Sequence, residues 1–193
     1  MILYHADTYE QLYEGQTLVA KQGRTPIFHL YPKGVCSYGE RAFLKPDNEI
    51  QSSMQSADIL FDYVRVLRFP DKPSRFTSVF ASSCLEESKT WLERISRDFD
   101  TKTDGSHAPS THGIPIYAVE CDSVYIADAQ YLDFGNALQG SQPSLVNLLP
   151  YALAYWESVQ RTDTERIGSM LQTYKKPELL LVPPVRVLHR VYP

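Results

Sequence analysis

The spacing of hydrophobic and polar residues changes along the chain and predicts both strands and helices. At the N-terminus, the β-branched and aromatic residues of Ile2–Ala6 precede a turn-prone Asp-Thr pair, which is typical of a short strand. Further along, five apolar residues recur at intervals of three and four: Ile50, Met54, Ala57, Phe61 and Val64. This spacing places them on one face of a helix. We therefore expect a helix that begins near Asp47 and ends before Pro70.

The segment Pro73–Trp91, PSRFTSVFASSCLEESKTW, predicts a strand followed by a helix. In TSVFAS, the period of two places Val79 and Ala81 on one side of the strand. The opposite side carries Ser78, Phe80 and Ser82. Ser83–Glu86 then has the S-x-x-E pattern of a capping box, which opens a helix. The segment is either an ordinary strand–helix unit, with Val79 and Ala81 facing the core, or a unit whose other side forms the wall of a nucleotide pocket.

The rest of the chain predicts more short strands and one more helix. Strands are expected in Ile114–Glu120, Val124–Asp128, Glu178–Val182 and Val185–Tyr192. A helix is expected in Pro143–Val159, with a kink at Pro150. Tyr31–Lys45 is rich in Pro, Gly and aromatic residues, and we expect it to be irregular. Because strands and helices do not alternate regularly and no linker divides the chain, the sequence predicts a single α+β domain over residues 1–193.

Composition and charge narrow the class of protein. Among 193 residues, 19 Lys and Arg stand against 23 Asp and Glu, and the net charge of −4 disfavours a broad nucleic-acid surface. The three cysteines form no CxxC pair, so we predict neither a zinc site nor a disulfide framework. The sequence has no signal-peptide pattern and no apolar run near the about 20 residues of a membrane span. We expect a cytoplasmic protein with no membrane or metal partner.

Two residues stand out as candidates for chemistry, and each has a structural alternative. The phosphate-binding patterns GxGxxG and GxxxxGK[ST] and the catalytic patterns HExxH and GxSxG are all missing from the sequence. His5 ends the first predicted strand, where an imidazole either bonds a ribose or diphosphate or serves as a structural histidine. Glu178 begins a strongly apolar strand, either as its solvent-facing start or as a carboxylate held rigidly at a cleft.

The order of these features resembles the ADP-ribosyltransferase superfamily. Tyr4 and His5 on the first strand, an aromatic strand followed by a capped helix, and Glu178 on a late strand are similar to its His–aromatic–Glu branch. That branch includes diphtheria toxin, the poly-ADP-ribose polymerases and the DarT toxins. FPDKPSRFTSVFAS and the helix around Ala152–Trp156 resemble an uncharacterised bacterial domain family. VFASSCLEESKTW and IYAVE are similar to rifampin ADP-ribosyltransferase.

The resemblance implies an α+β ADP-ribosyltransferase domain with split mixed or antiparallel sheets flanked by helices, and with NAD as the substrate. Glu178 matches the catalytic glutamate. His5, with Tyr4 beside it, matches the histidine that holds the adenosine-side ribose. Phe80 occupies the place of the tyrosine that stacks on nicotinamide, so the aromatic face is kept and the hydroxyl is lost. Rifampin-type enzymes lack a comparable glutamate, which leaves a structural role open for Glu178.

Three further residues complete the expected NAD site. Arg75 is a candidate for the diphosphate, because a guanidinium pairs with phosphate through two parallel hydrogen bonds. Ser78 and Ser82, on the expected face of Phe80, are candidates for the nicotinamide amide or a ribose hydroxyl. With these residues, the sequence predicts mono-ADP-ribosylation of an acceptor with release of nicotinamide, and NAD hydrolysis as a side activity.

Other functions stay open from the sequence. The acceptor is a protein, a nucleic acid or a small molecule, and a toxin, a bacterial or phage conflict factor and a housekeeping enzyme all fit. A non-catalytic nucleotide-binding or protein-interaction module on the same fold is the main alternative. A metal-free hydrolase using Glu120 or Asp128 is a third interpretation, although no nucleophile–base pair accompanies these carboxylates.

Overall fold

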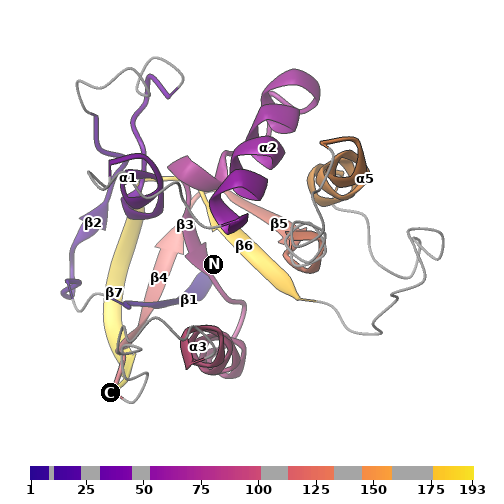
Figure 1. Cartoon of the computed structure of the whole chain (residues 1–193). Helices are drawn as coiled ribbons and strands as arrows, with labels where there is room; N and C mark the ends of the chain where they lie inside the picture. The colour runs from indigo at the N-terminus through magenta and orange to yellow at the C-terminus, as the bar shows by residue number, and fades with distance from the viewer. Residues whose placement is uncertain (9–10, 23–30, 45–52, 101–112, 133–144, 158–175) are drawn as a thin grey trace. The chain divides into compact units, whose positions relative to one another are not determined.

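The computed structural model describes seven segments of the chain (Figure 1): residues 1–8, 11–22, 31–44, 53–100, 113–132, 145–157 and 176–193. Contacts within the chain cluster into two compact units. Unit 1 consists of Met1–Val19, Val79–Val124 and Leu181–Pro193, and unit 2 consists of Ala20–Ser78 and Tyr125–Leu180. Each unit therefore combines segments that are far apart in the sequence.

Unit 1 contains a sheet of four strands in the order β1-β4-β7-β2. The strands are β1 (Ile2–Ala6), β2 (Thr17–Leu18), β4 (Ile116–Cys121) and β7 (Val185–Tyr192). Neighbouring strands pair antiparallel. Strand β2 is short, because only Thr17–Leu18 pairs with β7. β4 is buried from Ile116 to Val119, as expected of a strand with a neighbour on each edge.

Helix α3 (Leu85–Asp100) packs against this sheet. The apolar cluster between them contains Leu92, Ile114 and Ile116. Partly buried residues pack around it, among them Tyr4, Ala6, Leu85, Val191 and Tyr192. The expected strand before the helix is present as β3 (Val79–Ala81). At the start of α3, the backbone N–H and the hydroxyl of Ser83 bond to Glu87, at 3.0 and 2.7 Å, so the carboxylate that reaches back is Glu87 instead of the expected Glu86.

Unit 2 contains α1 (Ser37–Leu44), α2 (Ser53–Arg68), the 3₁₀ helix η2 (Arg75–Thr77) and α5 (Leu145–Trp156). It also contains most of β5 (Val124–Asp128) and β6 (Pro177–Leu181), which are neighbouring strands of a second sheet. Helix α5 continues through Pro150, as the sequence predicts. The expected start of α2 at Asp47 lies outside the described residues.

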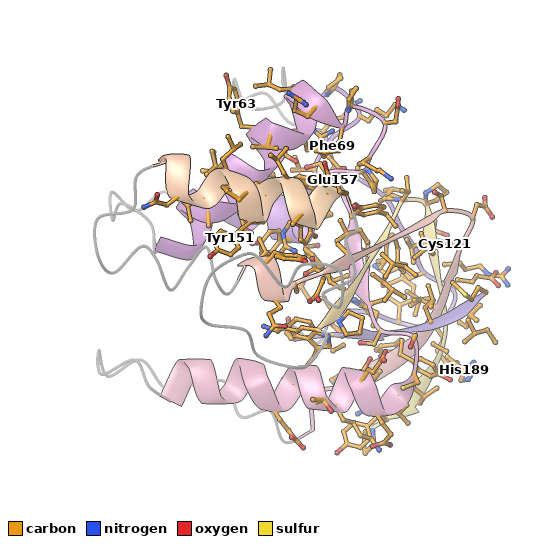
Figure 2. All side chains as sticks on the ribbon, turned by 90° about the vertical axis from the view of Figure 1, so that its right-hand side faces the viewer. Tyr63, Phe69, Cys121, Tyr151, Glu157 and His189 are labelled. Carbon is orange, nitrogen blue, oxygen red and sulfur yellow. The ribbon has the colours of Figure 1, made fainter. Side chains whose placement is uncertain are left out.

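Helix α2 is amphipathic, and α5 packs against it. Its buried side carries the expected Ala57, Phe61 and Val64. The Trp156 indole of α5 donates a hydrogen bond to the Phe61 carbonyl at 2.6 Å, which joins the two helices. The outer side of α2 carries exposed apolar residues, and Figure 2 shows Tyr63 projecting outward from it.

Helix α1 corrects one prediction, since the sequence indicates an irregular segment over Tyr31–Lys45. The segment forms a helix because it packs closely on η2. The Cys36 N–H donates to the Phe76 carbonyl at 2.8 Å, just before the helix begins. Gly39 lies so close that an added Cβ would be 2.4 Å from the same carbonyl oxygen. Tertiary contact therefore overrides the weak local helix signal.

The combination of helices and antiparallel sheets confirms the α+β class. Among the helices within the described segments, none has both the length and the apolar character required to cross a bilayer.

Candidate functional site

Four of the predicted site residues lie together in unit 1, on β1 and at β3. Tyr4 and Ser82 form an antiparallel bridge, in which Tyr4 N donates to Ser82 O at 3.0 Å and Ser82 N donates to Tyr4 O at 2.8 Å. One residue after Tyr4 and two residues before Ser82, the His5 ring contacts the Phe80 carbonyl, with 2.6 Å between Nδ1 and the oxygen. The sequence-based prediction therefore names residues that are neighbours in space.

The contact between His5 and Phe80 shows which nitrogen of the imidazole ring carries a proton. A carbonyl oxygen only accepts hydrogen bonds, so Nδ1 of His5 carries the proton and donates it. His5 and Phe80 are both half-buried. Val79 and Ala81 are buried, as predicted, but Ser78 and Ser82 are buried too, so burial alternates only within the three residues of β3.

The two predicted serines lie in different units, and both are buried. Ser82 is buried and contributes its backbone to the bridge with Tyr4. Ser78 belongs to unit 2 and ends η2, and its hydroxyl donates to the Ser74 carbonyl at 2.8 Å. At the other end of η2, the Ser74 hydroxyl accepts the Phe76 N–H at 3.1 Å. In this structure the Ser78 side chain therefore stabilises the 3₁₀ turn that holds Arg75.

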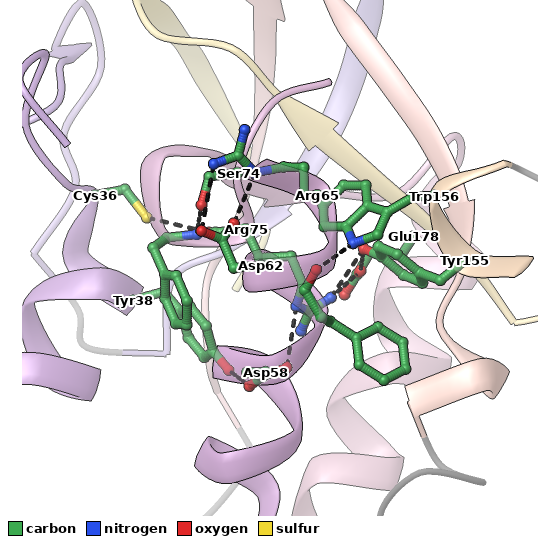
Figure 3. Close-up of polar contacts among 12 residues, drawn as sticks. Cys36, Tyr38, Asp58, Asp62, Arg65, Ser74, Arg75, Tyr155, Trp156 and Glu178 are labelled. Carbon is green, nitrogen blue, oxygen red and sulfur yellow. Dashed lines mark hydrogen bonds and ion pairs between the residues drawn. The ribbon is translucent and has the colours of Figure 1, made fainter. Parts of the chain in front are cut away.

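Unit 2 contains a buried polar group around Arg75, which we call the Arg75 cluster (Figure 3). Its members come from five elements: Tyr38 on α1, Asp58 on α2, Arg75 on η2, Tyr155 on α5 and Glu178 on β6. Arg75 Nη1 donates to Glu178 Oε2 and also to the Tyr155 hydroxyl, at 3.2 Å. Arg75 Nε forms an ion pair with Asp58 Oδ1 at 3.2 Å. One guanidinium thus contacts two carboxylates.

Each carboxylate in the cluster also accepts a tyrosine hydroxyl. Tyr155 donates to Glu178 Oε2 at 2.5 Å, and Tyr38 donates to Asp58 Oδ2. The two rings also flank the guanidinium, with Arg75 Cζ 5.7 Å from the Tyr38 centroid and 5.8 Å from the Tyr155 centroid. Rings at this distance stabilise a cation through their π faces. The Arg75, Asp58 and Glu178 side chains are 6–9% exposed, so the ion pairs lie away from bulk water.

Burial is the main influence on the titration of the cluster. Burial raises the pKa of the Asp58 carboxyl above its ordinary value, and Arg75 only partly offsets this. Burial, and then the charges of Asp58 and Glu178 respectively, raise the pKa of the Tyr38 and Tyr155 hydroxyls. Burial alone would lower the pKa of Arg75, but Glu178, Tyr155 and Asp58 outweigh it and raise the pKa. Both tyrosines therefore remain hydrogen-bond donors and Arg75 remains a cation.

A second buried polar group in unit 2 has a similar construction. Asp62 on α2 accepts the Tyr31 hydroxyl at 2.5 Å and the Arg65 Nε at 2.8 Å. Arg65 also donates to the Lys72 carbonyl at 3.2 Å, which joins α2 to the chain before η2. Like the contact between Tyr155, Arg75 and Glu178, this group consists of a tyrosine, an arginine and a carboxylate. None of the predicted site residues belongs to the group around Asp62.

Sequence reasoning missed Tyr38, Asp58 and Tyr155. The sequence does contain an indication of Asp58 and Asp62. The two aspartates lie four residues apart within the apolar pattern of α2, where a buried carboxylate requires a polar partner. The sequence gives no indication of a polar role for Tyr155, because an aromatic residue in an apolar helix is typical of core packing. Reasoning named Arg75 and Glu178 but assigned them to different parts of NAD, whereas the structure brings them into direct contact.

The carboxylates of the hydrolase interpretation have ordinary structural roles. Glu120 forms an ion pair with Arg186 at 2.7 Å, across β4 and β7, with both side chains substantially exposed. Asp128 accepts the backbone N–H groups of Gln130 and Lys176, at 3.0 and 3.1 Å. Within the described segments, no three His, Cys, Asp or Glu side chains gather as the ligands of a metal ion.

No protein-family model matches the chain, and no curated protein matches its sequence. The resemblance to ADP-ribosyltransferases therefore depends on the residues and on their order along the chain, and it stays a prediction.

Proposed function

We propose that the chain is an NAD-dependent ADP-ribosyltransferase, which breaks the bond between nicotinamide and ribose and transfers ADP-ribose to an acceptor. The observation that carries the proposal is the contact between His5 and Phe80. The family resemblance requires a histidine and an aromatic residue from separate segments at one site. Residues 75 positions apart in the sequence are in contact here, and both are half-buried, as residues that line a site usually are.

The donor role of Nδ1 has a consequence for how His5 would bind NAD. Because Nδ1 donates to the Phe80 carbonyl, a bond to a ribose hydroxyl has to be made through Nε2. Neutral imidazole accepts the hydroxyl hydrogen at Nε2. The same contact fixes the orientation of the ring, so the cofactor does not have to order it on binding. Phe80 offers a π face for the nicotinamide ring, worth about 0.5–1.5 kcal/mol beyond its burial.

Glu178 supplies the electrostatic part of the proposed mechanism. Cleavage of the nicotinamide–ribose bond resembles glycoside cleavage, in which positive charge develops on the ribose. A carboxylate near that ribose stabilises the transition state more than the ground state. We assign Glu178 this role, in which it accepts a hydrogen bond from the ribose and offsets the developing charge. Metal ions are not needed for this chemistry.

The test is incubation of the purified chain with NAD labelled separately in the nicotinamide and in the adenosine part. Free nicotinamide reports cleavage, and adenosine label on lysate protein, nucleic acid or the chain itself reports transfer. Glu178→Gln is expected to lower the rate on the order of 10²–10³-fold, the usual effect of one preorganised electrostatic group. Glu120→Gln, which removes a surface carboxylate, is the matched control and keeps the rate. A wild-type chain that releases no nicotinamide contradicts the proposal.

The second candidate is a binding module without turnover. It is favoured by one observation: the Glu178 carboxylate is buried and ion-paired with Arg75, as a structural carboxylate would be. The same experiment separates the two candidates. Saturable NAD binding in calorimetry without nicotinamide release supports the module, whereas release that depends on Glu178 supports the transferase.

A further inference from the structure

We propose that Arg75 and Tyr155 are positioning residues that hold the Glu178 carboxylate for catalysis, an inference that rests on the proposed transferase function. Both side chains donate a hydrogen bond to the same atom, Glu178 Oε2. Because both hydrogen bonds end on Oε2, we assign Oε1 as the oxygen that accepts from a ligand. Arg75 thereby has a role different from the diphosphate contact that the sequence suggests.

The hold on Glu178 is rigid because its donors are themselves fixed. Arg75 Nη1 also donates to the Tyr155 hydroxyl at 3.2 Å, so the three groups form a closed triangle. The Tyr155 ring is buried and packs edge-on against Trp156 and Phe61, with centroids 4.7 and 5.6 Å apart. A carboxylate with one oxygen bound at two points cannot rotate without breaking both bonds. Such preorganisation is what electrostatic catalysis requires.

Asp58 and Tyr38 hold the guanidinium from its other end. Asp58 contacts Arg75 Nε at 3.2 Å, and Tyr38 donates to Asp58. Asp58 lies on the buried side of α2, where the helix backbone limits its movement. The contacts thus continue from Tyr38 through Asp58 and Arg75 to Glu178. Arg75 is thereby hydrogen-bonded at Nη1 and ion-paired with Asp58 at Nε, an arrangement that a lysine at position 75 would not reproduce.

The test is steady-state kinetics of nicotinamide release with the full chain, with rates calculated per folded molecule. Tyr155→Phe removes one hydrogen bond to Glu178 and keeps the packed ring. Arg75→Lys keeps the positive charge but cannot contact Asp58 and Glu178 through two separate nitrogens, as the guanidinium does. Each is expected to lower kcat on the order of 10- to 100-fold, with KM for NAD changed by less than about 3-fold, because misplacement affects the transition state more than ground-state binding. Reduced melting temperature alone does not produce this split between kcat and KM.

Two matched variants control for the loss of a buried polar contact elsewhere in unit 2. Tyr125→Phe removes a buried hydroxyl that bonds the carbonyls of Tyr155 and Trp156, at 3.1 and 2.7 Å, without contacting Glu178. Arg65→Lys disrupts the pair with Asp62. Both are expected to reduce stability and to keep kcat within about 2-fold per folded molecule, as changes outside the catalytic contacts do.

The outcomes separate this inference from the proposed function. If the wild type turns over NAD and Glu178→Gln does not, but Tyr155→Phe and Arg75→Lys keep the wild-type kcat, the positioning role is wrong and the transferase function stands. A fall of kcat in the control variants as large as in Tyr155→Phe also overturns the inference. If the wild type shows no turnover, both proposals fail together.

Discussion

The hydroxyl of Tyr155 lies 2.5 Å from Oε2 of Glu178, and it donates the hydrogen bond between them. Helix α5 and strand β6 provide these two residues, so the bond joins elements that are separated in the sequence. Burial and the neighbouring carboxylate raise the pKa of Tyr155, which keeps its hydroxyl protonated. Glu178 is thus a fixed acceptor inside unit 2, and its surroundings lead to specific expectations for mutants.

Loss of the Arg75 side chain is expected to be costly to stability. Arg75→Met leaves two buried carboxylates, Asp58 and Glu178, without their cation, and breaking a buried pair typically costs about 3–5 kcal/mol. Arg186→Met is the contrasting case, because its pair with Glu120 is exposed and such pairs contribute about 0–1 kcal/mol. Urea denaturation of both variants measures the two losses. Equal losses would mean that the Arg75 cluster does not stabilise unit 2 beyond an ordinary surface pair.

The pH dependence of stability is expected to report Asp58. Burial raises its pKa in the folded state above the ordinary 3.8, so the folded chain binds this proton more tightly than the unfolded chain does. The resulting stabilisation is fully present below about pH 3.8 and is lost as the pH rises through the folded-state pKa. Asp58→Asn cannot titrate and lacks this contribution.

The measurement is the free energy of unfolding of both proteins in urea, at several pH values from about 4 to 7. The stability of the wild type relative to Asp58→Asn should fall as the pH rises. Tyr38, Arg75 and Glu178 are the charged or titratable groups that act on Asp58, and they are common to both proteins. A relative stability that instead grows with pH would show that Arg75 outweighs burial and lowers the pKa.

Gly39→Ala tests the close packing of α1 on η2. Alanine is ordinarily favoured over glycine in a helix by about 1 kcal/mol. Here the added Cβ would lie 2.4 Å from the Phe76 carbonyl oxygen and 2.8 Å from Val35 Cβ, so backbone has to move. We expect a net loss of roughly 1–3 kcal/mol, typical of overpacking. Glu40→Ala, the next position on the same helix, should change stability by less than about 1 kcal/mol. A stabilised Gly39→Ala would contradict the close approach.

His5→Ala is expected to weaken NAD binding without unfolding the chain. The loss of one hydrogen bond to the ribose corresponds to roughly 0.5–1.5 kcal/mol, or a Kd about 2- to 13-fold higher in calorimetry. The melting temperature should fall only slightly, because the bond to the Phe80 carbonyl is half-buried. His189→Ala, an exposed histidine on β7, is the matched control and keeps the wild-type Kd (Figure 2). Unchanged Kd in a folded His5→Ala variant removes His5 from the site.

The sequence predicts the elements whose own pattern is strong. β1 follows from its β-branched and aromatic residues before a turn, and the buried side of α2 follows from the spacing of its apolar residues. Helix α1 was not predictable in this way, because Gly39 and the Phe76 carbonyl make it helical through a tertiary contact. The Arg75 cluster was not predictable for the same reason. Arg75 and Glu178 are 103 residues apart, and no local sequence pattern indicates that they pair. The sequence analysis identifies both residues as candidates, but their direct contact is visible only in the three-dimensional structure.

The order of strands in unit 1 has a consequence for biosynthesis. β7 follows every other strand in the sequence, yet it lies between β4 and β2 in the sheet. Until β7 has left the ribosome, β4 can pair with β1 on one edge, while the edge that pairs with β7 in the folded sheet stays open. Completion of this sheet therefore has to wait for β7, and the long-range pairing is expected to slow it. A nascent chain that stalls before β7 exposes a strand edge that chaperones recognise and that aggregates readily.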